Sequence, residues 1–238
     1  MQIRSLTNDW TILVLAGPKS RDVLSAVSRG DWSAAAFPWL SVREAYVGIA
    51  PAIVMAISFS GELAYEIHIP NAQLYAAYLA LREAGRAHHL RLFRSRAIES
   101  MRMEKGHLHW KSDILTEFDP FETGLEHFVK MDKPNFIGKA ALEVRQAKGL
   151  KKTLVSLRVD CTDRAAHAGA SVVLGGRVVG TVTSGEWGHR TGLNLAYAFL
   201  DADAVNAKGL KANLLGDPIS VTVMPAGPYD PGNTLVRM

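Results

Sequence analysis

The stretch SFSGELAYEIHIP, residues 58–70, is the most informative sequence for the structure of the first part of the chain. The residues that lead into it, AIVMAISF (52–59), favour a strand, and the short polar SGE sequence breaks that strand. YEIHI (65–69) then alternates apolar and polar side chains with a period of two. This pattern predicts a β-hairpin in which Glu66 and His68 share one face, while the tyrosine and the two isoleucines share the other.

Strands and helices alternate around this hairpin. Residues 11–16 (TILVLA) are typical of a buried strand, and Pro18 marks the start of a helix that Gly30 closes. After the hairpin, apolar residues at helical spacing predict a second helix that ends near Gly85. Strand, helix, hairpin and helix over residues 1–88 predict one α+β lobe.

The remaining sequence changes character near residue 149. Residues 95–105 (SRAIESMRMEK) favour a helix that Gly106 stops, so 89–148 is a helical remainder of a first domain, 1–148. Residues 149–238 contain short β-rich runs separated by turns, including a two-residue hairpin loop in LGGR. The second domain is therefore predicted to be a small antiparallel barrel or sandwich.

Composition places the chain among ordinary globular proteins, with 48% hydrophobic and 21% charged residues among 238. No apolar run approaches the roughly 20 residues of a membrane span, so we expect no membrane partner. The first residues contain no apolar signal-peptide core, and we expect a cytoplasmic protein. The single cysteine, Cys161, rules out an internal disulfide and a cysteine-based metal cluster.

The net charge of +4 is too small and too scattered to indicate a nucleic-acid partner. Basic residues do gather in one stretch: Arg82, Arg86, Arg91, Arg94, Arg96, Arg102, Lys105 and Lys111. A solvated helix face is the first interpretation of this stretch, and a basic wall for an anionic ligand is the alternative.

Several familiar catalytic motifs do not occur in the sequence. It has no G-x-G-x-x-G, no phosphate-binding G-x-x-x-x-G-K and no G-x-S-x-G. These absences weigh against a flavin dehydrogenase, a nucleotide hydrolase and a serine hydrolase. His107 and His109 lack a carboxylate motif that would complete a metal site, so we predict none.

Three stretches, in their order and spacing, resemble a known family: residues 58–70, SRAIESMRMEKGHLHWKSDI (95–114) and EFDPFETGLEHFVKMDKPNFIGKAAL (117–142). GTVTSGEWGHRTG (180–192) and the terminal MPAGPYDP agree with them. The chain is similar to the glycine cleavage T-protein (aminomethyltransferase) family, and most of all to the folate-binding C-terminal portion of dimethylglycine and sarcosine dehydrogenases.

The resemblance implies a partial cloverleaf, T-protein-like folate-binding fold of the α+β class with a C-terminal antiparallel β-barrel. It also implies tetrahydrofolate as the cofactor and a small amine-derived one-carbon donor as the other ligand. The implied function is aminomethyl or methylene transfer from units derived from glycine, sarcosine or dimethylglycine. A non-catalytic folate-binding or scaffold protein of the same fold, or a folate-dependent demethylase, remains an alternative.

Four residues match the family's folate site by their place in these stretches. Glu66 would accept two hydrogen bonds from the pteridine, and Arg96 would offer a planar fork of donors to a carboxylate or carbonyl. Phe59 stands where T-proteins carry a tyrosine, so it can stack on a ring but has no hydroxyl. Trp110 would line the channel. Without the family resemblance, Glu66 would be interpreted as an exposed strand residue and Arg96 as a surface arginine. The two aromatic residues would be interpreted as packing side chains.

The family's catalytic aspartate has no counterpart at the matching distance ahead of the hairpin. Asp9, Asp22 and Asp31 lie too close to it in sequence. The catalytic residue is therefore unknown, and we expect the family's N-terminal segment to be missing. Either a partner chain supplies that segment, or the chain is a truncated product that at most binds folate. Assembly into a homo-oligomer is the alternative to a partner chain.

We predict that the isolated chain alone forms no methylene-tetrahydrofolate from an aminomethyl carrier, sarcosine or dimethylglycine. Loss of one preorganised charge at the transition state commonly costs about 10²–10³ in rate. A spectrophotometric assay of the product, with and without the N-terminal region of a related protein, checks this. Robust turnover by the chain alone would contradict it.

Overall fold

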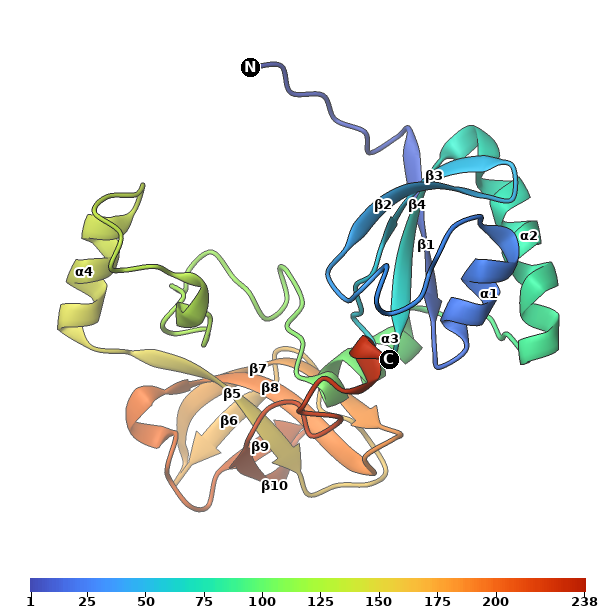
Figure 1. Ribbon diagram of the computed structural model, residues 1–238. Helices are drawn as coiled ribbons and strands as arrows, with labels where there is room; N and C mark the ends of the chain where they lie inside the picture. Colours follow the sequence, from blue (N-terminus) through green and yellow to red (C-terminus); the bar gives the residue numbers. More distant parts are fainter. The chain divides into compact units, whose positions relative to one another are not determined.

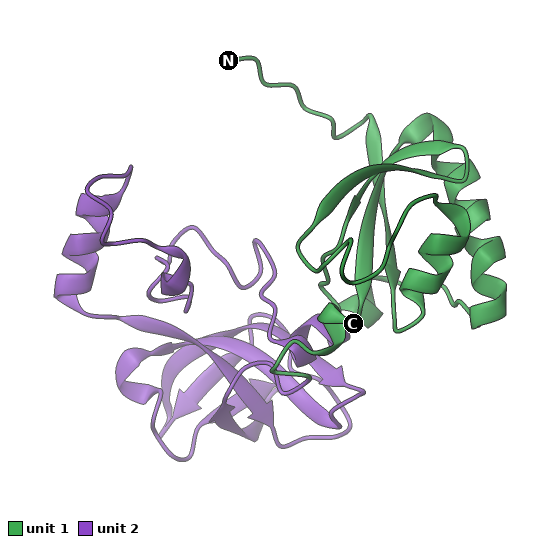
Figure 2. Cartoon of the chain, in the orientation of Figure 1, with its two compact units in different colours: residues 1–98, 230–238 green, residues 99–229 purple.

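A computed structural model describes residues 1–238. The chain forms two compact units (Figure 2). Unit 1 consists of residues 1–98 and 230–238, and unit 2 consists of residues 99–229. The division falls within helix α3 (Ser95–Lys105), whose bounds agree with the sequence prediction. The expected α+β class with an antiparallel barrel is confirmed. No helix in the chain has the length and apolar character needed to cross a membrane.

Unit 1 is built on a four-stranded antiparallel sheet in the order β1-β4-β3-β2 (Figure 1). Its strands are β1 (Trp10–Ala16), β2 (Val42–Val47), β3 (Ala50–Met55) and β4 (Ala64–Pro70). The sequence predicted the hairpin of β3 and β4, although β3 ends earlier than expected. It did not predict β2, because VREAYV mixes charged and apolar residues at a sheet edge where little apolar patterning is required.

Two helices, α1 (Ser20–Val27) and α2 (Leu74–Gly85), cover one face of this sheet (Figure 1). The core between them includes Leu15, Leu24, Tyr65, Ile67 and Ile69, all buried. Tyr65, Ile67 and Ile69 are the predicted apolar face of β4. Short 3-10 turns stand before and after α2, at Asn71–Gln73 and Arg86–His88.

The turn from β3 to β4 depends on a glycine and two serines. Gly61 has φ +84°, a left-handed conformation that favours glycine. Its N–H donates to the Ser58 hydroxyl at 3.0 Å, and the N–H of Glu62 donates to the Ser60 hydroxyl at 3.3 Å. Local hydrogen bonds of this kind are why SGE interrupts the strand pattern.

Unit 2 contains a closed six-stranded antiparallel barrel in the order β10-β5-β8-β7-β6-β9. Its strands are β5 (Lys152–Val159), β6 (Ser171–Leu174), β7 (Arg177–Gly188), β8 (Leu193–Asp201), β9 (Lys211–Leu214) and β10 (Asp217–Met224). The predicted two-residue loop joins β6 to β7, with Gly175 and Gly176 both at positive φ. The sequence pattern does not predict strand β9, because this strand has only four residues.

A helical arm precedes the barrel in unit 2. It contains a 3-10 turn, Glu126–Phe128, and helix α4 (Lys139–Lys148), in which no residue is buried. Gly149 ends α4 with φ +74°, and β5 begins three residues later. The domain boundary placed near residue 149 from the sequence stays a prediction. Two further 3-10 turns are Ala202–Ala204 and, in unit 1, Leu235–Arg237.

Close packing inside the barrel predicts the effect of Gly185→Ala. A Cβ at this position of β7 would overlap the carbonyl oxygen of Ala166, which cannot move as a flexible side chain could. We expect a loss of about 1–3 kcal/mol in the free energy of unfolding, measured by urea denaturation. Gly232→Ala is the control, since its nearest neighbour is Thr234 Cγ2 at 3.6 Å. Equal stability of the two variants would contradict this packing.

Candidate functional site

The site begins with Glu66, at the centre of the sheet face that the helices leave uncovered in unit 1. In register with it lie Val14 on β1 and Met55 on β3. The Glu66 side chain is 28% exposed, so its carboxylate is partly withdrawn from water. Its strand neighbours Tyr65 and Ile67 point into the core instead. The predicted alternation of β4 therefore places Glu66 on the face opposite α1 and α2.

His68 is the only polar side chain in contact with Glu66. Its Nε2 lies 3.4 Å from the Glu66 Oε2, and this nitrogen is buried without a hydrogen-bond partner. No donor in the chain forms a hydrogen bond to the Glu66 carboxylate. Partly buried carboxylates normally accept several hydrogen bonds, because losing water without replacement is unfavourable. Glu66 therefore has acceptor capacity that a ligand could use.

Apolar side chains surround this carboxylate. Ile12 and Val14 on β1 are exposed at 47% and 44%, and Ile53 and Met55 on β3 are half-buried. Together they form a flat apolar surface with one acidic group at its centre, on a rigid sheet. Such a surface suits a planar, mostly apolar ring whose edge carries hydrogen-bond donors.

The other predicted site residues lie on three different segments. Phe59 is half-buried in the turn that joins β3 to β4, so it belongs to the same hairpin as Glu66. Arg96 is exposed in the first turn of α3, also in unit 1. Trp110 is 59% exposed and belongs to unit 2. The structure thus joins Glu66 and Phe59 through one hairpin, and all four assignments stay predictions.

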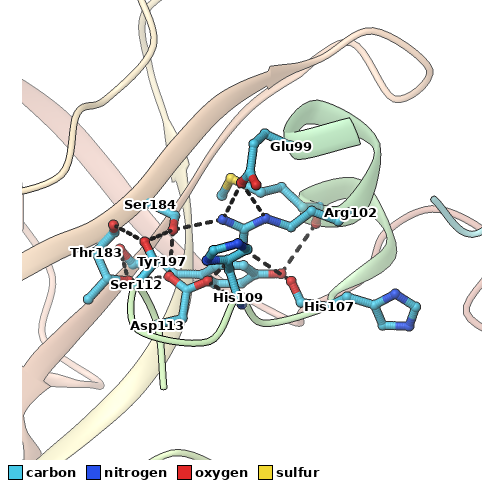
Figure 3. A network of polar contacts seen from close by, with 10 residues as sticks. Glu99, Arg102, His107, His109, Ser112, Asp113, Thr183, Ser184 and Tyr197 are labelled. Carbon is cyan, nitrogen blue, oxygen red and sulfur yellow. Dashed lines mark hydrogen bonds and ion pairs between the residues drawn. The ribbon is translucent and has the colours of Figure 1, made fainter. Parts of the chain in front are cut away.

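In unit 2, a buried ion pair joins α3 to the segment that follows it (Figure 3). Arg102 Nη1 lies 2.6 Å from Asp113 Oδ2, and the two side chains are only 1% and 0% exposed. The same guanidinium donates to Glu99 at 2.8 Å, to the Ser184 hydroxyl at 2.8 Å and to the His107 carbonyl at 3.1 Å. Every edge of the guanidinium therefore has an acceptor.

The hydrogen-bonding capacity of the Asp113 carboxylate is also filled by groups of the protein. It accepts hydrogen bonds from the N–H of His109 at 2.9 Å and from the hydroxyls of Thr183 and Ser184, both at 2.6 Å. The Tyr197 ring lies 5.6 Å from the Arg102 guanidinium, and burial raises the pKa of the Tyr197 hydroxyl. A carboxylate with all these donors has little capacity left for a ligand, so the network fixes the fold of the loop 107–113.

A second buried carboxylate, Glu104, fixes the other side of α3. It accepts from the Arg190 main chain at 2.7 Å, from Arg190 Nε at 2.6 Å and from the N–H of Thr191 at 2.8 Å. The Arg190 guanidinium also covers the Tyr229 ring, 3.7 Å from its centroid. These contacts hold the β7–β8 loop against α3 within unit 2.

The sequence resemblance predicts a role for Arg96 in this helix but none for Arg102. The spacing of Glu99 and Arg102, three residues apart, predicts an ion pair on one helix face and was the available signal. Burial of that pair depends on Asp113, Thr183 and Ser184, which come from distant parts of the sequence. Similarly, the alternation of β4 predicts that His68 shares a face with Glu66, but only the structure shows that the His68 Nε2 is buried and makes no hydrogen bond.

A helix-covered antiparallel sheet followed by a six-stranded antiparallel barrel is a T-protein-like fold. The solved aminomethyltransferase T of the Bartonella henselae glycine cleavage system matches it with a TM-score of 0.53 at 18% identity, over 93% of this chain and 84% of that one. Residues 1–133 match the model of the GCVT N-terminal domain, and residues 152–230 match that of the glycine cleavage T-protein C-terminal barrel domain.

The chain belongs to the glycine cleavage T-protein family. It is 34% identical to the mitochondrial dimethylglycine dehydrogenase of Homo sapiens over 84% of its length and 32% identical to the mitochondrial sarcosine dehydrogenase of Mus musculus over 99%. It is 29% identical to the aminomethyltransferase of Saccharopolyspora erythraea over 92%. The chain spans 23% and 27% of the two dehydrogenases and 60% of the aminomethyltransferase.

The buried network predicts the effect of Asp113→Asn. The substitution removes the fully buried counter-charge of Arg102 and leaves only Glu99, which is 31% exposed, and breaking such a buried pair costs about 3–5 kcal/mol. Urea denaturation of wild type and variant measures this loss. The control is Asp203→Asn: this residue pairs with Arg177 at 3.2 Å but is 71% exposed, and such pairs contribute about 0–1 kcal/mol. Similar losses in both variants would contradict a structural role for the buried pair.

Proposed function

We propose that this chain binds tetrahydrofolate and is the folate-binding part of an enzyme that transfers aminomethyl or methylene units. The observation that carries the proposal is the Glu66 carboxylate, which is partly buried, accepts no hydrogen bond within the chain, has only His68 Nε2 as a polar contact at 3.4 Å, and lies on a flat apolar sheet face. Membership of the T-protein family supports the same ligand.

The chemistry of the pteridine ring matches this surface. One edge of the ring presents a ring N–H and an exocyclic amino group side by side, and both are donors. A carboxylate can accept from the two donors at once, and charge-assisted hydrogen bonds are about twice as strong as neutral ones. The flat ring would lie on the side chains of Val14 and Met55, beside Glu66, and remove them from water.

The other predicted residues would hold the remainder of the ligand. Phe59 would stack on an aromatic ring, and Arg96 would bind a carboxylate of the ligand through its fork of donors. The prediction that Trp110 lines the folate channel rests on the family resemblance alone. Bound tetrahydrofolate would supply the nitrogen that accepts a one-carbon unit from an amine derived from glycine, sarcosine or dimethylglycine. The residues named here bind and orient the ligand.

Folate binding without a catalytic contribution from residues 1–238 is the second candidate, and one observation favours it. Each aspartate ahead of the hairpin has a local partner: Asp9 pairs with Arg4 at 2.7 Å, Asp22 lies 3.3 Å from Lys19, and Asp31 accepts from the main chain of Ser33 at 2.8 Å. The last of these bonds lowers the pKa of Asp31. None of the three is positioned beside Glu66.

Glu66→Gln tests the proposed site. The amide replaces one acceptor oxygen with a donor that faces the pteridine donors, so we expect tetrahydrofolate binding to weaken by roughly 1–3 kcal/mol. Anaerobic isothermal titration calorimetry of wild type and variant measures the difference. Glu44→Gln is the matched control, because Glu44 is exposed on the neighbouring strand β2 and its loss removes the same charge. Equal affinities for wild type and Glu66→Gln would remove Glu66 from the site.

A further inference from the structure

Strand β1 forms an edge of the unit 1 sheet, and its sequence does little to protect that edge. Its residues, WTILVLA, include no charge and no proline. Exposed edge strands of this kind readily pair with another chain, and natural proteins usually guard them with charges, prolines or bulges. The register with β4 is regular from Trp10 to Ala16, so no bulge interrupts the edge either.

The main-chain groups of β1 that point away from the sheet can be identified from the register. Gly17 donates to Leu63 and Asn71 donates to Asp9, which fixes the odd-numbered residues of β1 as those hydrogen-bonded to β4. The N–H and C=O groups of Ile12 and Val14 therefore point outward. No hydrogen bond within the chain uses them.

A groove of about 360 Å³ runs along this edge. One wall is β1 itself, and the others are α2 and the segment 90–95. Its apolar lining includes Tyr78, Leu81, Leu90, Leu92, Phe93 and Ile98. Leu92 is 70% exposed and Phe93 is 40% exposed, so part of this apolar lining is open to solvent. Unpaired main-chain groups thus lie beside an uncovered apolar surface.

The charges around the groove are all positive. Arg82, Arg91 and Arg94 line it, and its lining contains no acidic residue. Arg82 contacts the Tyr78 ring at 5.7 Å, while Arg91 and Arg94 are exposed and form no ion pair within the chain. This arrangement favours an occupant that carries negative charge.

We propose that the β1 edge binds an extended segment of a partner polypeptide that alternates apolar and acidic side chains. The segment adds to the sheet as a further strand through the main-chain groups of Ile12 and Val14. Its apolar side chains fill the groove, and its carboxylates face the three arginines. A second copy of this chain is a poorer occupant, because pairing β1 with β1 would bring two identical sets of arginines together.

The probe is a capped, fluorescein-labelled peptide of alternating valine and glutamate, and fluorescence anisotropy measures its binding to the full chain. A peptide with lysine at every glutamate position is the matched control. We expect the glutamate peptide to bind and the lysine peptide to bind at least several-fold more weakly. Equal binding of both peptides, or of neither, would overturn the proposal.

Charge reversal makes the test sharper. Arg91→Glu combined with Arg94→Glu should weaken binding of the glutamate peptide roughly 3- to 30-fold and strengthen binding of the lysine peptide. Lys208→Glu, at an exposed position of unit 2, is the control and should change neither affinity. An unchanged preference in the double variant would show that the arginines do not select the occupant.

Val14→Pro tests the strand addition itself. Proline removes an N–H that points away from β4, so the sheet keeps its own hydrogen bonds while the edge loses a donor. We expect peptide binding to fall in Val14→Pro and to persist in Val14→Thr, with both variants folded by circular dichroism. Binding that persists in Val14→Pro would overturn the proposal. Sedimentation showing a dimer of wild type that Val14→Pro abolishes would also overturn it, in favour of a second copy.

Discussion

The buried pair of Arg102 and Asp113 is the interaction on which unit 2 depends. Two charges removed from water are tolerable only if each finds a counter-charge and enough hydrogen bonds. Here these come from α3, from the loop 107–113 and from β7, so the three segments must come together for the pair to be buried. Glu104 imposes the same requirement on the β7–β8 loop. These contacts hold the C-terminal part of α3 and the barrel together within unit 2.

The polar groups on the free face of unit 1 are in the opposite situation. The Glu66 carboxylate accepts no hydrogen bond within the chain, and its one polar contact is the buried His68 Nε2 at 3.4 Å, which itself makes no hydrogen bond. Structural carboxylates in this chain are surrounded by donors of the protein, as Asp113 and Glu104 are. Glu66 is therefore a group whose hydrogen-bonding capacity is available to a ligand, and this distinction separates the candidate site from the buried network.

Unit 1 also shows how one sequence pattern produces two kinds of surface. The alternation that buries Leu13 and Leu15 toward the helices exposes Ile12 and Val14 on the other face, next to Glu66. The same strand ends the sheet, so its outward main-chain groups remain unpaired. The basic segment that the sequence suggested as a solvated face or an anion wall contributes Arg91 and Arg94 to the groove along that edge. Strand β1 thus contributes both to the apolar surface beside Glu66 and to the unpaired edge of the sheet.

The elements with local signals could be predicted from the amino-acid sequence: the alternation of β4, the bounds of α3 and the glycine loop between β6 and β7. Periodicity and turn chemistry act over a few residues, so they can be recognised without knowledge of the fold. Which polar groups have hydrogen-bond partners became known from the three-dimensional structure. Arg102 and Asp113 lie eleven residues apart, and their partner Ser184 is more than seventy residues further on. Burial and hydrogen bonding depend on contacts between such distant segments, and no local pattern records them.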